Sequence, residues 1–529
     1  MATELSVRGK NEFEDLIRAL EWSSEFAIYF AVVNPPLIRK QMAEELKGSL
    51  EKEKIQVHSL ELNSSYFDLL SIIPEKVPSY CLRGTETVIR SVVFIFGAEE
   101  AIASDVDTRR LFFDCLNWQR DKLRENIACP LVIWLPEFAL RILALETPDF
   151  WAWRSGVYYL EPEPVGILRD TQELLNVGTS EYVDLTYQEK IKRLQQFKAL
   201  LEDYERQPFE NESETELLGI RFNLLHYAGL VSFHLANYKD AKQYLLQGLK
   251  MAELLKDKEL FFLSFLGLSA VSKYQGDYTC AEEYTKKALQ IIQDIGDKSR
   301  IAPIFGLLGN YASLQKDYNK AKDFFKKELE IGKELGNNEL IASALGELGV
   351  LAKKQEKYTE SMSLLEQSLK INVEIGDKEE IVINLIELSY LAKSQGNFNE
   401  AVRRIEEAHV ISTEIKDHRI TAKVLEVQGS LARDQGDYLR ARRYYEESLV
   451  IYKSLGYKFN IADVYGDLGS IASDSSDYEE AKRRYKESLK LFEEIGAKDR
   501  IALTQELFEN VEKLKKLDPA LEQERQEQK

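Results

Sequence analysis

Regularly spaced basic residues are the first candidates for a binding site in this chain. Each falls near the end of an expected helix, at the same place in a regular interval: Lys273, Lys353, Lys393 and Arg433. Ser313 stands at the one skipped position. Such cations can bind acidic groups of a partner through charge-assisted hydrogen bonds. They can also act only on the dipole of their own helix, which contributes ~0.3–1 kcal/mol each. The sequence leaves both explanations open.

A second cluster lies nearer the N-terminus and consists of Asp149, Trp151, Trp153 and Arg154. In an extended segment the two tryptophans would share one face, because side chains alternate along a strand. Arg154 could then bind a carboxylate or a phosphate. We prefer a structural explanation, in which the segment packs against a sheet and Arg154 pairs with Asp149.

Residues for catalysis or metal binding do not form a convincing set. Glu99 and Glu100 follow an expected strand and could imitate a magnesium-binding end, but an acidic pair alone is a weak signal. The four cysteines lack CxxC spacing, and the positions of His226 and His234 do not suit a helical ligand pair. The chain contains neither GxSxG nor HExxH. We therefore expect no catalytic residues, no metal and no cofactor, and a protein that is not an enzyme.

The elements that position the basic series come from a repeat of constant length. An aromatic residue recurs without a slip at Tyr238, Tyr278, Tyr318, Tyr358, Phe398, Tyr438 and Tyr478. A small residue follows each aromatic and another precedes it at fixed distances, as Ala441 and Gly429 do around Tyr438. A fixed period of this size predicts a solenoid. We expect two helices per repeat that cross at the small residues, with the aromatic filling the gap beside them as part of the core.

The spacing from Gly429 to Ala441 and the turn Gly436-Asp437-Tyr438 resemble the tetratricopeptide repeat, in the long variety found in kinesin light chains and many bacterial signalling proteins. The resemblance covers about residues 217–498. It implies an all-α superhelix whose concave groove binds a peptide or protein, and it places the basic series in that groove. The neighbouring groove positions differ between repeats. The groove candidates are therefore Lys273, Asn310, Val350, Lys353, Tyr390, Lys393 and Arg433.

The segment 1–165 alternates between apolar runs and helical stretches, which predicts a mostly parallel α/β sheet. We expect strands at residues 26–33, 55–62, 92–96 and 131–135, and helices at 36–53 and 106–126. The loop from Val33 to Lys40 has no glycine and two prolines, so it lacks the GxxxxGK[ST] phosphate loop. The blocks Trp118–Arg124, Pro130–Pro136 and Pro148–Gly156 resemble degenerate STAND-class signalling ATPase domains of bacteria. That resemblance implies a nucleotide-binding shape without the catalytic parts.

Composition shifts mark the expected domains. All five tryptophans precede residue 154, and nine of the twelve prolines precede residue 165. We predict a degenerate NTPase-like α/β domain at 1–165, a helical linker at 166–216 and seven repeats at 217–498. A capping helix that ends near Leu517 and a frayed tail should occupy 499–529. The most linker-like segment is Gln207 to Glu214.

Charge and hydropathy narrow the partners. The formal net charge of −19 argues against nucleic acid and against anionic membrane surfaces. The polar start predicts no secretion signal, and the longest apolar run, Phe26 to Val33, is far shorter than the ~20 residues of a membrane helix. We therefore expect a cytoplasmic scaffold or signalling adaptor that binds a peptide or protein partner. The alternative is a nucleotide-controlled switch with a repeat sensor. The oligomeric state is not predicted.

Overall fold

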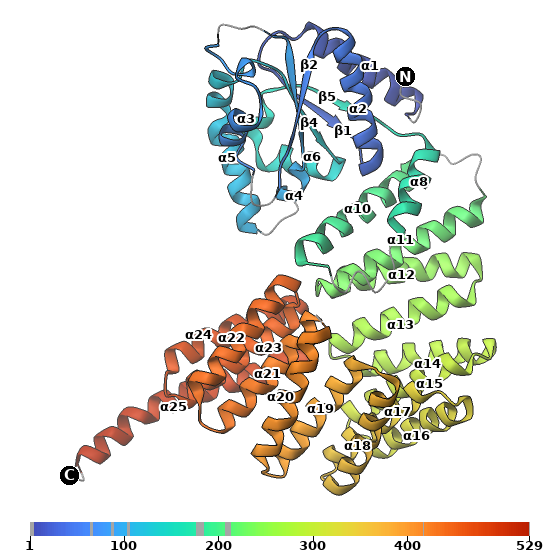
Figure 1. The fold of residues 1–529 in the computed structure, drawn as a ribbon, viewed down its shortest axis with the longest axis vertical. Helices are drawn as coiled ribbons and strands as arrows, with labels where there is room; N and C mark the ends of the chain where they lie inside the picture. The colour runs from blue at the N-terminus through green and yellow to red at the C-terminus, as the bar shows by residue number, and fades with distance from the viewer. Residues whose placement is uncertain are drawn as a thin grey trace. The chain divides into compact units, whose positions relative to one another are not determined.

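The computed structural model describes residues 5–63, 67–85, 89–102, 106–175, 185–206, 213–415 and 417–527 (Figure 1). The chain forms two compact units that divide between Val231 and Ser232. The linker-like segment Gln207 to Glu214 lies mostly outside the described residues. Within these residues, no helix has both the length and the hydrophobicity needed to cross a bilayer.

The first unit contains a five-stranded sheet in which every pair of neighbouring strands is parallel. The strand order is β2-β3-β4-β1-β5. The four predicted strands are present, and a fifth follows them: β1 Ile28–Val32, β2 Gln56–Glu61, β3 Ser91–Phe96, β4 Leu131–Leu135 and β5 Arg154–Tyr159. The mostly parallel α/β fold predicted from alternating segments is thus confirmed.

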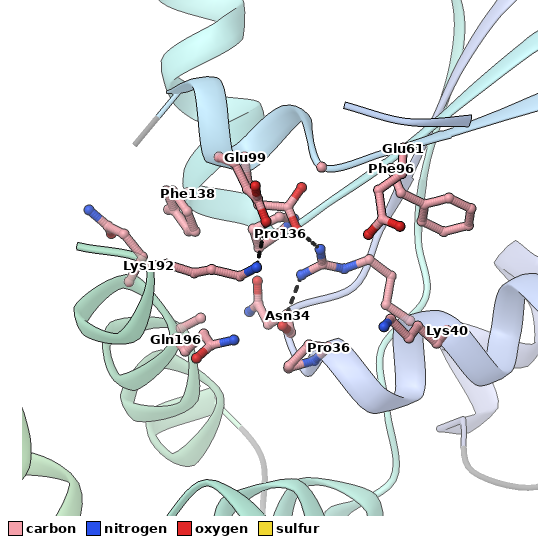
Figure 2. Close-up of a pocket in the computed structure, with 15 residues that line it drawn as sticks. Asn34, Pro36, Lys40, Glu61, Phe96, Glu99, Pro136, Phe138, Lys192 and Gln196 are labelled. Carbon is pink, nitrogen blue, oxygen red and sulfur yellow. Dashed lines mark hydrogen bonds and ion pairs between the residues drawn. The ribbon is translucent and has the colours of Figure 1, made fainter. Parts of the chain in front are cut away.

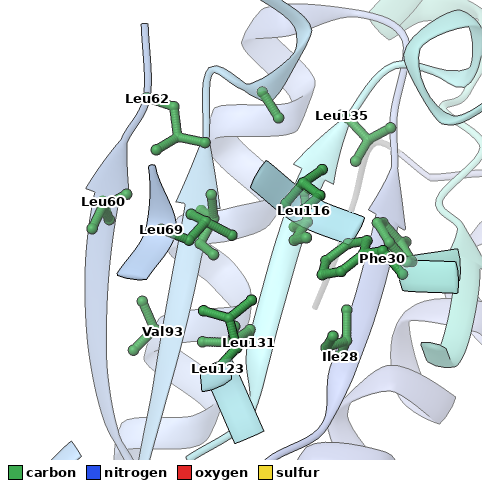
Figure 3. Close-up of a cluster of buried hydrophobic side chains, with 14 of the residues drawn as sticks. Ile28, Phe30, Leu60, Leu62, Leu69, Val93, Leu116, Leu123, Leu131 and Leu135 are labelled. Atoms are coloured by element: carbon green, nitrogen blue, oxygen red, sulfur yellow. The ribbon is translucent and has the colours of Figure 1, made fainter. Parts of the chain in front are cut away.

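Helices cover both faces of this sheet, which explains why the central strands are apolar throughout. Alternate residues of β1 face opposite cores: Phe30 belongs to the core beneath α3, α5 and α6, whereas Tyr29 belongs to the core beneath α1 and α2. Figure 3 shows the first of these cores, with Phe30 beside Leu116 and Leu135. The helices are α1 Val7–Trp22, α2 Pro36–Lys52, α3 Leu69–Lys76, α4 Ala98–Ile102, α5 Val106–Asn126, α6 Glu137–Glu146, α7 Pro148–Trp151 and α8 Pro164–Leu175.

The connections of the sheet create a crevice at its carboxyl edge. Strand β1 lies between β4 and β5; the chain leaves β1 toward β2 at one edge of the sheet and leaves β4 toward β5 at the other. Open parallel sheets bind ligands at such a reversal of strand order, beyond the carboxyl ends of the strands. Among the described residues, α8 is followed by α10 Tyr187–Arg206 and α11 Glu214–His234, and α11 crosses the division between the units.

The second unit repeats a pair of helices, here named A and B, at the period predicted from the aromatic residues. The A helices are α13 Lys258–Tyr274, α15 Lys298–Leu314, α17 Asn338–Lys354, α19 Lys378–Ser394, α21 His418–Asp434 and α23 Lys458–Asp474. The B helices are α12 Tyr238–Leu255, α14 Tyr278–Ile295, α16 Tyr318–Leu335, α18 Tyr358–Ile375, α20 Phe398–Ile415, α22 Tyr438–Leu455 and α24 Tyr478–Ile495. The first B helix, α12, follows α11, and α25 Lys498–Glu527 follows the last pair. The backbone of α25 stays helical beyond Leu517, where the capping helix was expected to end.

Local signals set the ends of these helices. Most B helices begin after an acidic or amide N-cap, as at Asp437, whose side chain accepts a hydrogen bond from the backbone N–H of Arg440. Most end at a left-handed residue, as at Gly456. Side-chain oxygens satisfy the first backbone donors of a helix, and glycine adopts the left-handed stop at low cost. The caps therefore recur with the same period as the apolar residues.

The small residues of helices A and B meet where the helices cross, as predicted. Ser389 Oγ donates to the carbonyl oxygen of Ala401 at 2.8 Å, and Ser361 Oγ donates to that of Gly349 at 2.8 Å. In both pairs the two residues have the same sequence separation as Gly429 and Ala441. At the crossing, helix A carries glycine or serine and helix B carries alanine or serine.

The predicted role of the repeated aromatic is wrong in detail. Among the seven, only Tyr238 is buried, and Phe398 is 36% exposed. The crossing is instead filled by a residue two turns further along helix B: a Cβ on Gly309 would overlap the Phe325 ring, and one on Gly429 would lie 2.9 Å from Tyr445. The repeated aromatic is the first residue of helix B, so it lies at one end of the A/B helix pair and not at the crossing. A side chain two turns later on the same face reaches the crossing.

The A helices line the inner side of a curved array. Successive A helices contact one another directly in the pairs α15/α17, α17/α19 and α19/α21, and α23 contacts α25 in the same way. The curve brings distant repeats together. Tyr274 on α13 packs edge-on against Phe459 on α23, with ring centroids 5.7 Å apart. The side chains on the inner side of the A helices are therefore the ones that a bound segment would meet.

Candidate functional site

Two places in the described residues have the position of a functional site: the crevice at the carboxyl edge of the sheet and the inner surface of the array. The crevice contains a pocket of about 200 Å³. Residues following β1, β3 and β4 line it together with side chains of α10 (Figure 2). Sites for drug-sized ligands usually occupy about 300–1,000 Å³, so this pocket is smaller than such a site.

Arg39 fills the space directly beyond the end of β1. The residue is 7% exposed. Its Nε donates to the carbonyl oxygen of Val33 at 3.0 Å, its Nη2 donates to that of Asn34 at 3.3 Å, and its Nη1 pairs with the Glu99 carboxylate. A phosphate site would need backbone N–H groups at this helix N-terminus. Proline has no backbone N–H group, so Pro35 and Pro36 supply no such donors here. The Arg39 guanidinium, bound to two carbonyl oxygens, occupies the space where a phosphate would lie.

The acidic pair after β3 takes part in ion pairs. Glu99 pairs with Arg39, and Glu100 accepts from Lys192 of α10 at 2.5 Å. Gly97 precedes them with φ +79°, and a Cβ there would overlap the backbone of Leu62, so the turn requires glycine. Among the residues that the structure describes, no group of three or more His, Cys, Asp or Glu side chains is arranged to hold a metal ion.

Helix α10 is held over the crevice by a chain of polar contacts through Asn34. The Asn34 side chain accepts from the backbone N–H of Glu137 at 2.9 Å and donates to Asp203 Oδ1 at 2.8 Å. Arg206, one turn beyond Asp203, pairs with the Glu137 carboxylate. Burial raises the pKa of Asp203 to about 7, although the hydrogen bond from Asn34 and the charge of Arg206 lower it. A helix that lies outside the sheet thus closes its carboxyl edge.

The tryptophan cluster does not form the extended segment that its alternation suggested. Pro148–Trp151 is the short helix α7, and β5 begins only at Arg154. Proline suits the first turn of a helix, where its missing N–H costs little. Trp151 packs against Phe30 in the sheet core, with ring centroids 5.3 Å apart.

The charged members of that cluster also have partners other than those expected. Asp149 lies 3.3 Å from Arg120, and the Arg154 guanidinium stacks 4.4 Å from the centre of the Trp151 ring. Arg154 is therefore not paired with Asp149, although the segment does pack against the sheet. Trp153 lies beneath the guanidinium groups of Arg120 and Arg124, at 5.9 and 5.5 Å.

On the inner surface of the array, three of the four basic residues pair with a carboxylate of the next A helix. Lys353 Nζ lies 2.5 Å from Glu387, and Lys393 Nζ lies 2.5 Å from Asp434 at the end of α21. Arg433 Nε lies 2.6 Å from Asp474. Lys273 is exposed, and its ammonium lies 5.5 Å from the Tyr274 ring centre. These three ion pairs link neighbouring repeats, a role that neither the partner nor the dipole explanation included.

The other groove candidates lie between these ion pairs. Asn310 Nδ2 donates to Glu347 of the next A helix at 3.0 Å. Tyr390 lies beneath the Lys353 ammonium, 5.1 Å from the ring centre, and Val350 is half-buried on the same helix as Lys353. Burial raises the pKa of the Tyr390 hydroxyl to about 12, and nearby carboxylates add to this effect against the charge of a lysine. The candidates thus share one surface with a set of carboxylates.

Sequence reasoning missed those carboxylates because it looked only for cations. A comparison of successive repeats could have found them: the partner of Lys353 lies 34 residues later in the sequence, and the partner of Arg433 lies 41 residues later. The role of Arg39 had no such signal. Its partners Val33, Asn34 and Glu99 are assembled only by the order of the strands.

These features define a solenoid-repeat protein that carries a parallel α/β domain. Models of the tetratricopeptide repeat match residues 261–334, 341–375, 381–454 and 420–494. These matched segments are therefore tetratricopeptide repeats, as the small-residue spacing and the Gly-Asp-Tyr turn indicated. No curated protein sequence matches the chain.

Several solved structures are similar in part. Aspartyl phosphate phosphatase F from Bacillus subtilis is 13% identical and covers 62% of this chain and 88% of its own, with a TM-score of 0.43. The apo form of the quorum sensor NprR from B. thuringiensis is 18% identical and covers 61% and 93%, with a TM-score of 0.43. A STAND protein with a tetratricopeptide-repeat sensor from Pyrococcus horikoshii is 14% identical and covers 96% and 86%, with a TM-score of 0.38.

Proposed function

We propose that this protein is an interaction scaffold or signalling adaptor, whose array binds a peptide or an extended segment of a partner protein on its inner surface. The proposal rests on a contrast between the crossing positions of the repeat, which are constant in size, and an inner position, which varies in chemistry. The residues at the helix crossings are small in every repeat, whereas one inner position presents Asn310, Val350, Tyr390 and Ser430 in successive repeats. In the next repeat this position holds Ser470, which is buried. A surface that changes chemistry repeat by repeat on a constant frame can distinguish the side chains of a bound segment.

The residues proposed to contact the partner are the groove candidates. Lys273 is exposed, so it can bind an acidic group without breaking an existing ion pair. Lys353, Lys393 and Arg433 would have to exchange their present carboxylates for those of the partner, which lowers the net gain from each contact. Asn310, Val350 and Tyr390 supply an amide, an apolar and an aromatic contact between them. Asp149, Trp151, Trp153 and Arg154 stay candidates for a second docking surface on the α/β domain.

The test compares partners captured by the full chain and by two variants in the native cell. Lys273→Glu with Tyr390→Ala changes the inner surface, and Lys490→Glu changes an exposed lysine on the outer helix α24. Affinity purification with mass spectrometry should show a partner that the wild type and Lys490→Glu retain and the double variant loses. A partner set that is the same for all three proteins would show that the groove is not the main site.

The nucleotide-controlled switch is the alternative, and the position of the crevice at the strand-order reversal favours it. The place of Arg39 favours the scaffold, because its guanidinium occupies the strand end where a phosphate would bind. Calorimetry with ATP and Mg²⁺ separates the two functions. The scaffold predicts no binding tighter than ~100 μM, which corresponds to about −5.5 kcal/mol. Tighter binding would favour the switch.

A further inference from the structure

Asp467 stands out among the carboxylates of the inner surface because Arg433 has two acidic residues close by. In this array Lys353 pairs with an acid 34 residues later, and Arg433 pairs with one 41 residues later, Asp474. Asp467 occupies the position that the first of these spacings would give for Arg433. Among the contacts of the described residues, no ion pair or hydrogen bond satisfies Asp467.

A second carboxylate near Asp467 is also incompletely satisfied. Glu426 is 7% exposed, and its Oε2 pairs with Lys423 Nζ at 2.5 Å. Its Oε1 is buried, and the donor beside it is the buried hydroxyl of Tyr452, a neutral group that does not balance the carboxylate charge.

The charges around this group leave one carboxylate in excess. The acids are Glu426, Asp463, Asp467 and Asp474, and the bases are Lys423, Arg433 and Arg500. Burial raises the pKa of Asp467 to about 7, and the charges of Glu426 and Asp463 raise it further against Lys423 and Arg433. Burial and the charge of Glu426 likewise raise the pKa of Asp463 to about 6. One more positive charge would relieve both carboxylates.

We propose that Asp467, with Glu426 and Asp463 beside it, binds the cationic side chain of a lysine or arginine in the segment held on the inner surface. This inference rests on the proposed scaffold function and names the chemistry of its ligand. An ammonium or guanidinium group donates charge-assisted hydrogen bonds to a carboxylate. A divalent metal fits less well, because Ca²⁺ and Mg²⁺ take six or more oxygen ligands and Lys423 and Arg433 stand close by.

The test uses the full chain as bait for a displayed library of random heptapeptides. The wild type, Asp467→Asn and Asp323→Asn are screened in parallel, since Asp323 is an exposed acid on the outer helix α16. We expect the wild type and Asp323→Asn to select peptides with lysine or arginine at one fixed position. Asp467→Asn should select peptides without that preference. A selected peptide whose basic residue is replaced by glutamine should bind the wild type at least about ten-fold more weakly, yet bind Asp467→Asn with no such loss.

The outcomes distinguish this inference from the proposed function. Peptides selected by the wild type without a basic preference overturn the cation site and leave the scaffold function standing. A screen in which the wild type enriches no peptide overturns both. Thermal unfolding supplies an independent measurement: Asp467→Asn removes an excess charge and should melt at the same or a higher temperature. A lower melting temperature would show that the carboxylate stabilises the array itself, against the proposal.

Discussion

Arg39 and Glu99 form an ion pair at the carboxyl edge of the sheet, joining the segments that follow β1 and β3. Both side chains are largely buried, and Glu99 Oε2 has no hydrogen-bond partner among the described residues. The pair places a positive and a negative charge inside the crevice where a parallel sheet would bind a ligand. The carboxyl edge of the sheet, where a functional site is expected, is therefore occupied by a structural ion pair.

Removing one partner of this pair should destabilise the α/β domain. Arg39→Met leaves the Glu99 carboxylate buried without its cation and also frees two carbonyl oxygens, so we expect a loss of about 3 kcal/mol in the free energy of unfolding. Denaturant titration followed by tryptophan fluorescence measures this domain alone, because all five tryptophans precede residue 154.

The matched control is the double variant Arg39→Met with Glu99→Gln. Its loss should be smaller than the sum of the two single losses by at least about 1 kcal/mol, since neither charge is then left alone. Additive losses would show that the two side chains do not interact in solution.

The pKa of Asp203 predicts a dependence of stability on pH. Its pKa rises from the ordinary value of 3.8 to about 7 in the folded protein because the carboxyl group is buried. Between about pH 4 and pH 7, Asp203 ionises in the unfolded chain but stays protonated in the folded protein. The free energy of unfolding therefore falls as the pH rises, by about 1.4 kcal/mol for each unit of difference between the two pKa values. Asp203→Asn cannot ionise and keeps an oxygen for Asn34. Its stability relative to the wild type should increase over this range and stay constant above it.

Tryptophan fluorescence in denaturant at pH 4.5, 6, 7 and 8 would measure that difference for both proteins. A difference that does not change with pH would mean that Asp203 ionises normally in the folded state. Glu189→Gln is a useful comparison on the same helix, because the hydrogen bonds from Thr186 lower the pKa of Glu189, and its contribution has the opposite sign.

The ion pair between Lys353 and Glu387 should couple neighbouring repeats of the array. Both side chains are partly buried, so we expect a coupling of about 0.5–1.5 kcal/mol, somewhat above that of an exposed pair. A double-mutant cycle with Lys353→Met and Glu387→Gln, followed by far-UV circular dichroism, measures it. Lys370 and Glu374 form an exposed pair within α18 and provide the control cycle. Equal coupling in the two cycles would count against a role for Lys353 in joining the repeats.

The helix crossing should tolerate alanine at one glycine and reject it at another. A Cβ on Gly309 would overlap the Phe325 ring, so Gly309→Ala should destabilise the array by about 1–3 kcal/mol. A Cβ on Gly466 has room, 3.7 Å from its nearest neighbour, so Gly466→Ala should stabilise its helix by about 0.5–1 kcal/mol. Thermal melting of the two variants checks the contrast, and similar effects at both sites would refute it.

The helices of the array and four of the five strands could be predicted because their signals are local. Asp437, Gly456 and the apolar residues between them fix one helix without reference to the rest of the chain. Strand β5 escapes prediction because Gly156 interrupts its apolar pattern and because Trp151 and Trp153 suggest an extended segment that begins too early. The tryptophan segment changes from helix to strand near Trp153, and no local sequence rule marks that point.

The sequence by itself determined the period, the helix pairs, the small residues at each crossing and the absence of a phosphate loop, because each of these depends on residues within a few turns or one repeat. Only the tertiary structure decided which charges meet. Arg39 reaches Glu99 because the strand order places β1 and β3 on either side of β4, and Arg433 pairs with Asp474 of the next A helix, whereas Asp467 has no ion pair among the described residues. Such contacts join residues far apart in the chain, and their energy depends on burial and distance, which no local pattern contains.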